Sequence, residues 1–124
     1  MKKKILAIDD EVTITRLLKL NLEQSGKYVV REENDGTRAL ATAREFKPDL
    51  VLLDIMMPDV DGGDVAASIS ADPQLKKIPI VFLTAAVKKE ELAERGNIIG
   101  GYQYIAKPLD VKGVIAVIQK HLGR

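Results

Sequence analysis

The sequence has no cysteine and no tryptophan, and aromatic residues make up only 4% of it. The absence of cysteine excludes a disulfide framework, a thiolate metal site and a cysteine nucleophile, and it suits the reducing cytoplasm, where we expect the protein to lie. No apolar run approaches the roughly 20 residues that a membrane-spanning helix needs. Residues 1–4 are basic like the start of a signal peptide, but the apolar run at 5–8 ends in two aspartates. We therefore expect a strand there and no membrane segment.

The charges are nearly balanced, with 19 basic residues against 18 acidic ones and a formal net charge of +1. Such a balance gives no overall basic field for direct nucleic-acid binding. A length of 124 residues suits one compact domain. We find no long linker, low-complexity stretch or internal repeat, so residues 1–124 are predicted to form a single domain.

Short apolar runs alternate with helical patterns along the chain. Four runs lack polar alternation, which is typical of strands covered on both faces. They are residues 5–8, 50–53, 80–83 and 104–106. A fifth run, 28–31, is more polar and suits an edge strand. Because strand-helix-strand units build a parallel sheet with helices on both faces, we expect a three-layer α/β fold.

Two of the predicted helices have clear end signals. Asp10 is expected to cap the first helix, and Asp110 and Gly123 are expected to begin and end the last one. Weaker helical patterns occupy residues 37–45, 63–71 and 88–95. The last of these has few apolar side chains among many charged ones, so we expect a weakly anchored helix there.

Polar residues follow most of the apolar runs directly. Asp9 and Asp10 follow the first run, Asp54 the second, Thr84 the third and Lys107 the last. The carboxyl ends of parallel strands lie at one edge of a sheet, where ligands bind. We therefore expect three carboxylates, a hydroxyl and an ammonium to converge on one pocket.

Each of these residues alone has an ordinary explanation as a helix cap, a turn residue or a strand residue, but the set together indicates chemistry. Crowded carboxylates repel one another, so the site either binds a cation or holds a proton. Oxygen ligands favour a hard cation such as Mg²⁺, and a lysine beside it suits a phosphoryl group. Attack by the Asp54 carboxylate on phosphorus would give an acyl phosphate, with the metal, Lys107 and Thr84 neutralising the equatorial oxygens.

On these residues the sequence resembles the receiver domains of two-component response regulators, over nearly the whole chain. The matching motifs are the acidic pair within residues 8–11, the strand and loop at 48–58 with Asp61 and Gly62 after it, and the segments 78–85 and 104–108. The likeness is to single-domain chemotaxis regulators. It implies a flavodoxin-like, doubly wound (βα)5 fold with a parallel sheet of order 2-1-3-4-5.

The resemblance also implies a role for each site residue. Asp54 would be the phosphoacceptor, and Lys107 would pair with the phosphoryl group, its bond to Pro108 being cis. The implied ligands of Mg²⁺, or of Mn²⁺ in its place, are Asp9, Asp10, Asp54 and the backbone carbonyl of Met56. Thr84 and Tyr104 would form a switch that biases the surface made by the fourth helix, fifth strand and fifth helix. Tyr102 is an alternative for the aromatic part of that switch.

The implied partners are a sensor histidine kinase or phosphotransfer protein as phosphoryl donor and a downstream target protein. The chain would be a monomer or a phosphorylation-dependent dimer, without direct contact to nucleic acid or membrane, and would catalyse only its own phosphorylation and dephosphorylation. His121, Asp59 and Asp61 are expected to be structural residues rather than phosphoryl carriers or ligands.

Three alternatives remain beside this interpretation. A phosphatase of the haloacid-dehalogenase type normally needs a second aspartate two residues after the nucleophile, where this chain has Met56. A receiver that signals by docking alone usually lacks one of the five polar site residues, all of which are present here. The chain is also compatible with a receiver fragment of a larger regulator with an output domain.

The side chains of Met56 and Ala86 lead to a prediction about the lifetime of the phosphorylated form. Both lie near the expected attack path of water, and neither can position a water molecule through a polar group. We therefore expect slow self-dephosphorylation, and Met56→Asn or Ala86→Glu should change the decay rate of the acyl phosphate, followed as loss of phosphorylated protein by intact mass. Unchanged decay in both variants would contradict this reasoning.

Overall fold

Strands and helices alternate along the chain in the computed structural model, which describes residues 1–123. The strands are β1 (Lys3–Ile8), β2 (Tyr28–Glu33), β3 (Leu50–Asp54), β4 (Ile80–Thr84), β5 (Ile98–Ile99) and β6 (Tyr102–Ala106). The helices are α1 (Val12–Gln24), α2 (Ala39–Phe46), α3 (Gly62–Ala71), α4 (Lys89–Glu94) and α5 (Val111–Leu122), with a short 3-10 turn, η1 (Gly36–Arg38), before α2. None of these helices is long and apolar enough to span a membrane.

The sheet has the order β2-β1-β3-β4-β6-β5. Strands β2, β1, β3, β4 and β6 are parallel, so the predicted order 2-1-3-4-5 is confirmed with β6 as its fifth member. Strand β2 lies at an edge, as its polarity indicated. The prediction missed β5, which pairs antiparallel with β6. Gly100 and Gly101 join the two strands with φ values of 58° and 85°, a backbone that glycine adopts without strain and that closes a tight hairpin.

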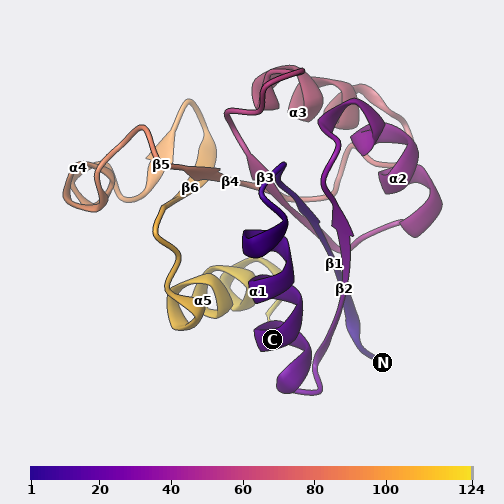
Figure 1. The fold of residues 1–124 in the computed structure, drawn as a ribbon, viewed down its shortest axis with the longest axis horizontal. Helices are drawn as coiled ribbons and strands as arrows, with labels where there is room; N and C mark the ends of the chain where they lie inside the picture. Colours follow the sequence, from indigo (N-terminus) through magenta and orange to yellow (C-terminus); the bar gives the residue numbers. More distant parts are fainter. Residues whose placement is uncertain (124) are drawn as a thin grey trace.

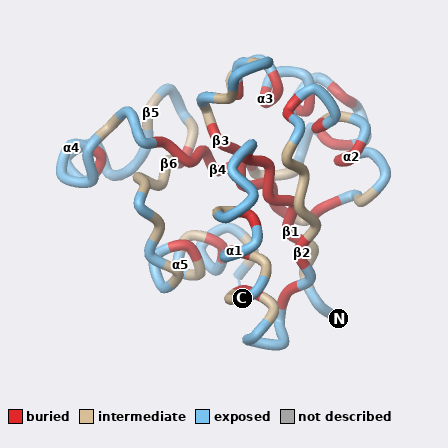
Figure 2. Tube along the Cα trace, in the orientation of Figure 1, coloured by how far each residue is buried: buried red, intermediate tan, exposed pale blue. Residues whose placement is uncertain are grey.

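Two helical layers cover the sheet, α1 and α5 on one face and α2 and α3 on the other (Figure 1). Side chains alternate between these faces along each central strand. In β1, Ile5 and Ala7 join the core beneath α1 and α5, whereas Leu6 and Ile8 join the core beneath α2 and α3. Strands β3 and β4 are therefore buried along their length and β1 is buried from Ile5 onward (Figure 2), which explains their unbroken apolar runs.

Helix α4 is the least anchored of the helices at the sheet. It lies beside the β5–β6 edge (Figure 1), and Leu92 is its one buried residue. Its remaining side chains are polar or charged apart from Ala93, which is exposed. The expectation of a weakly anchored helix in this segment agrees with that burial.

The prediction for the start of α1 is wrong. The N-cap is Glu11 and not Asp10, and the Glu11 side chain makes no cap bond. The turn before the helix is closed by Asp9, two residues before Glu11, whose Oδ1 accepts a hydrogen bond from the Glu11 N–H at 3.0 Å. This leaves the exposed Asp10 carboxylate free of the helix. The ends of α5 are as predicted, since Asp110 accepts from the Lys112 N–H and Gly123 has a left-handed φ of 74°.

The loop between β3 and α3 turns back so tightly that only glycine fits at its end. The Gly62 N–H donates to the Ile55 carbonyl at 3.0 Å, and a Cβ at position 62 would lie 2.5 Å from the Asp54 carbonyl oxygen and 2.6 Å from Ile55 Cα. Both are backbone atoms, so a side chain can be accommodated only if the loop itself moves.

Gly62→Ala should therefore destabilise the protein by about 1–3 kcal/mol through overpacking. The matched control is Gly113→Ala in α5, where the nearest atom would be 3.9 Å from the new Cβ. That change should stabilise the protein by about 0.5–1 kcal/mol because it removes a glycine from a helix interior. Urea unfolding of both variants measures the two effects, and equal effects would show that the loop adapts to a side chain.

Candidate functional site

The parallel strands bring the predicted site residues to one edge of the sheet. Asp9 directly follows β1, and Asp54 is the last residue of β3, the strand paired with β1. Thr84 ends β4, and its pairing partner in β6, Ala106, directly precedes Lys107. The residues converge because these neighbouring strands run in the same direction and end at the same level.

Three carboxylates form the centre of the site. Asp9, Asp10 and Asp54 each offer a carboxylate oxygen, and these oxygens lie within 4.8 Å of one another. Asp9 is fully buried and Asp54 is 4% exposed, whereas Asp10 faces solvent. The Asp54 Oδ1 atom accepts a hydrogen bond from the Met56 N–H at 3.2 Å, which leaves Oδ2 for other contacts.

Lys107 is the cation of the site. Its Nζ atom lies 2.9 Å from Asp9 Oδ2 and 3.6 Å from Asp54 Oδ2, and the exposed Glu11 carboxylate approaches it at 3.4 Å. Burial alone would lower the pKa of the ammonium, but the contact with Asp9 and the charges of Asp54 and Glu11 together raise it. Lys107 is therefore positively charged at neutral pH.

Burial raises the pKa of Asp54 to about 6, and the charges of Asp9 and Asp10 act in the same direction. The Met56 N–H and the Lys107 ammonium lower it, but not enough to cancel the burial. One ammonium against three nearby carboxylates leaves an excess of negative charge. A bound cation would offset that excess and favour the ionised form of Asp54.

The donor set fits a hard metal ion. Asp9 Oδ2 is buried, and among the described residues its polar contact is the Lys107 ammonium, 2.9 Å away. Three clustered carboxylates that share one ammonium are a typical Mg²⁺ environment. The backbone of Met56 adjoins Asp54 through its N–H, while the Met56 side chain is 68% exposed.

The remaining predicted residues surround this centre. Thr84 is 1% exposed, its Oγ1 accepts from the Ala86 N–H at 3.0 Å, and its carbonyl accepts from the Lys107 N–H at 2.8 Å. The Lys107–Pro108 bond is cis, as the resemblance implied. Tyr104 is half-buried with its ring 5.1 Å from that of Phe82.

Other candidates have structural positions. Tyr102 packs edge-on against the same Phe82 ring at 5.0 Å, so both tyrosines lie beside one aromatic residue. Asp61 caps α3 by accepting from the Gly63 N–H at 2.6 Å, Asp59 is an exposed loop residue, and His121 is exposed in the last turn of α5.

The sequence reasoning missed two residues that contact the acidic pair or its lysine. Glu11 reaches Lys107 Nζ, and Asn34 donates from Nδ2 to the backbone carbonyl of Asp9 at 2.8 Å. Asn34 lies in the loop after β2, so its place beside Asp9 could have been inferred from the predicted neighbourhood of strands β1 and β2. Its amide had no other signal in the sequence.

Comparisons with known proteins find relatives of nearly the whole chain. The model of the response regulator receiver domain matches residues 5–119. The polar-differentiation response regulator DivK of Brucella anthropi is 36% identical over 99% of this chain and 98% of its own length. The alkaline phosphatase synthesis regulator PhoP of Bacillus subtilis is 42% identical, and the chain spans only 50% of it, as it spans 49% of the transcriptional regulator RpaA of Synechocystis.

Solved structures show the same fold. The chemotaxis protein CheY4 of Vibrio cholerae superposes with a TM-score of 0.83 and 28% identity, over 98% of this chain and 100% of that one. The receiver domain of the sensor histidine kinase PA1611 of Pseudomonas aeruginosa, which has a magnesium ion in its active site cleft, gives a TM-score of 0.82 and 25% identity over 100% of both chains.

The raised pKa of Asp54 predicts a pH-dependent stability. Its folded value of about 6 lies above the unfolded value of about 3.9, so the native state binds more protons between these pH values. The free energy of unfolding should therefore fall as the pH rises from about 4 to about 6. Above about pH 6 Asp54 is ionised in both states, and the full cost of burying its charge is present. The difference between the two values corresponds to at most about 3 kcal/mol.

Asp54→Asn removes this cost, although it also loses the attraction of Lys107. In metal-free buffer the variant should be more stable than the wild type above about pH 6, and the difference should vanish toward about pH 4. Urea unfolding in the presence of EDTA measures it, with Asp59→Asn in the exposed loop as the control. A wild type that is as stable as Asp54→Asn at every pH would contradict the burial argument.

Proposed function

The chain belongs to the family of response regulator receiver domains, and we propose that it accepts a phosphoryl group on Asp54 in a Mg²⁺-dependent reaction. The observation that carries the proposal is the meeting of three carboxylates with one half-buried lysine at the carboxyl edge of the sheet. Neither a structural ion pair nor a simple turn explains three clustered carboxylates, two of them buried, that share one ammonium.

Mg²⁺, or Mn²⁺ in its place, would be held by Asp9, Asp10, Asp54 and the Met56 carbonyl, and when bound it supplies charge neutralisation to the phosphoryl oxygens. Asp54 supplies the nucleophile. Because the Met56 N–H holds Oδ1, Oδ2 is the oxygen directed toward Lys107, 3.6 Å away. A new bond forms between this oxygen and phosphorus, while the bond from phosphorus to the donor breaks and the donor keeps the electron pair.

Lys107 and Thr84 would contact the transferred group. The Lys107 ammonium now pairs with Asp9, and its flexible stem allows it to follow the added negative charge. The Lys107 N–H donates to the Thr84 carbonyl, so the two residues lie side by side at the same end of the sheet. Both side chains donate hydrogen bonds that suit a doubly charged phosphoryl group.

We further propose that phosphorylation is transmitted through Thr84 and Tyr104 to the surface formed by α4, β6 and α5. The short, weakly anchored α4 beside β6 is the part of this surface that can move at the lowest cost. Such a surface would bind a downstream target or a second phosphorylated copy. The phosphoryl donor would be a sensor histidine kinase or a phosphotransfer protein, in the cytoplasm.

The relatives include two arrangements of such a domain. DivK corresponds to the chain over almost its whole length, whereas PhoP and RpaA continue well beyond the matched part. In the first arrangement the target is a separate protein, and in the second it is an output domain of the same chain. We propose that residues 1–124 act as one receiver in either arrangement and catalyse only their own phosphorylation and dephosphorylation.

Intact-mass measurement after incubation with acetyl phosphate tests the proposal. The wild type should gain one phosphoryl group in the presence of Mg²⁺ and none in EDTA, and Asp54→Asn should gain none. Asp59→Asn, the same change in the neighbouring exposed loop, should react like the wild type. Absence of any addition to the wild type would favour a receiver that signals by docking alone, and addition to Asp54→Asn would place the phosphoacceptor elsewhere.

A further inference from the structure

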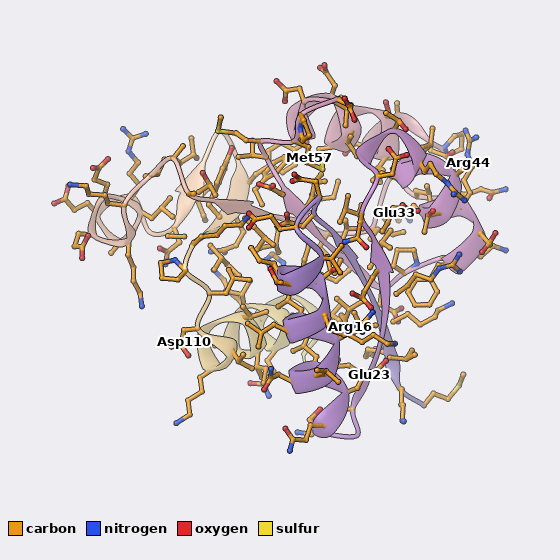
Figure 3. The ribbon with its side chains drawn as sticks, viewed as in Figure 1. Arg16, Glu23, Glu33, Arg44, Met57 and Asp110 are labelled. Carbon is orange, nitrogen blue, oxygen red and sulfur yellow. The ribbon has the colours of Figure 1, made fainter. Side chains whose placement is uncertain are left out.

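The backbone of Asp9 is held on both sides by the end of β2 and the loop after it. Its N–H donates to the Glu33 carbonyl at 3.2 Å, and its own carbonyl accepts from Asn34 Nδ2 at 2.8 Å. Figure 3 shows Glu33 near the end of β2, with α1 beside the strand. Asn34 thus fixes the peptide group that leads directly into Asp10.

A partly buried chain of polar side chains holds Asn34 in turn. Asn34 Nδ2 also donates to Thr15 Oγ1 at 2.8 Å, and Thr15 is fully buried in α1. The Thr15 hydroxyl donates to Glu32 Oε1 at 2.8 Å, and Glu32 Oε2 is paired with Arg16 at 3.1 Å. The asparagine therefore cannot rotate away without leaving buried partners unsatisfied.

We propose that Asn34 is a positioning residue for the metal site, a role that rests on the proposed function and assigns part of the Mg²⁺ affinity to a side chain that does not touch the metal. Asp10 is exposed, and no hydrogen bond within residues 1–123 holds its carboxylate. Its position is set by its backbone, and the peptide plane before it is set by the Asn34 amide. A second layer of hydrogen bonds that orients the ligands strengthens metal binding.

A pair of substitutions separates this role from a simple effect of charge. Asn34→Ala removes the donor, and Asn34→Asp removes it while placing a further negative charge near the acidic cluster. If charge alone mattered, Asn34→Asp would bind Mg²⁺ more tightly than the wild type. If the hydrogen bond to the Asp9 carbonyl matters, both variants bind it more weakly, because a carboxylate repels that carbonyl.

The experiment is calorimetric titration of Mg²⁺ into the metal-free protein. We expect about tenfold weaker binding for both Asn34 variants, the lower end of what lost support of metal ligands costs. Thr15→Val, which leaves Asn34 but removes its anchor, should have a smaller effect in the same direction. Asn21→Ala is the matched control, since Asn21 Nδ2 also donates to a backbone carbonyl at 2.8 Å but on the exposed side of α1.

Two further readouts distinguish positioning from general damage. The amides of Asp9, Asp10 and Glu11 should become more mobile on the nanosecond timescale in metal-free Asn34→Ala, as measured by ¹⁵N relaxation. The rate of phosphorylation by acetyl phosphate should fall at limiting Mg²⁺ and recover at saturating Mg²⁺. Urea unfolding shows whether Asn34→Ala is folded in the absence of denaturant. If it is not, the Mg²⁺ affinities of Asn34→Asp and Thr15→Val are compared with that of the wild type instead.

Mg²⁺ affinity of Asn34→Ala within twofold of the wild type, or tighter binding by Asn34→Asp, would overturn the inference. Failure of the wild type itself to bind Mg²⁺ is a different result, because it would refute the proposed metal site and the inference together.

Discussion

The burial of two carboxylates side by side is the constraint on which the rest of the site depends. Removing a carboxylate from water costs several kcal/mol even after the protein relaxes. Asp9 and Asp54 are both almost inaccessible, yet together they have one ammonium, Lys107, and two backbone N–H groups, those of Glu11 and Met56. These partners lower the cost without cancelling it, and the raised pKa of Asp54 is the part that remains. A site with this imbalance gains from binding a cation, and it stays responsive to any change in charge.

The sheet makes this burial possible because it is rigid directly behind the site. The residues before the acidic ones, Ile8 and Leu53, are fully buried in the core beneath α2 and α3, and they are paired in register. Repulsion between the carboxylates therefore cannot push the strands apart without breaking packed core. The loops beyond the strand ends and the lightly anchored α4 are the parts that can respond. A phosphorylation switch needs both properties, a rigid sheet that holds the site and adjoining loops and helices that can change conformation.

The sequence predicted the fold and the meeting of the acidic residues because both depend on strand order and strand ends. Apolar runs such as 50–53 show where the strands lie, and the residue after each run shows what reaches the edge. Other features depend on contacts between elements and have no local pattern. The start of α1 was misplaced because the side chain of Asp9, and not that of Asp10, accepts the hydrogen bond that closes the turn before the helix. Strand β5 was missed because two residues are too few for a periodic signal. Glu11 and Asn34 were missed because their roles come from which element lies beside them.

The central place of β1 in the sheet explains why the acidic pair follows this strand and not another. β1 is the strand that has β3 on one side and β2 on the other. From the β3 side comes Asp54, which completes the carboxylate cluster, and from the β2 side comes Asn34, which holds the backbone of Asp9. A strand at the edge of the sheet has only one neighbouring strand. Its acidic residues could then either form a carboxylate cluster with that neighbour or have their backbone held by it, but not both. The residues that would carry the chemistry therefore follow from where the strands end, and the residues that hold them follow from which strands are neighbours.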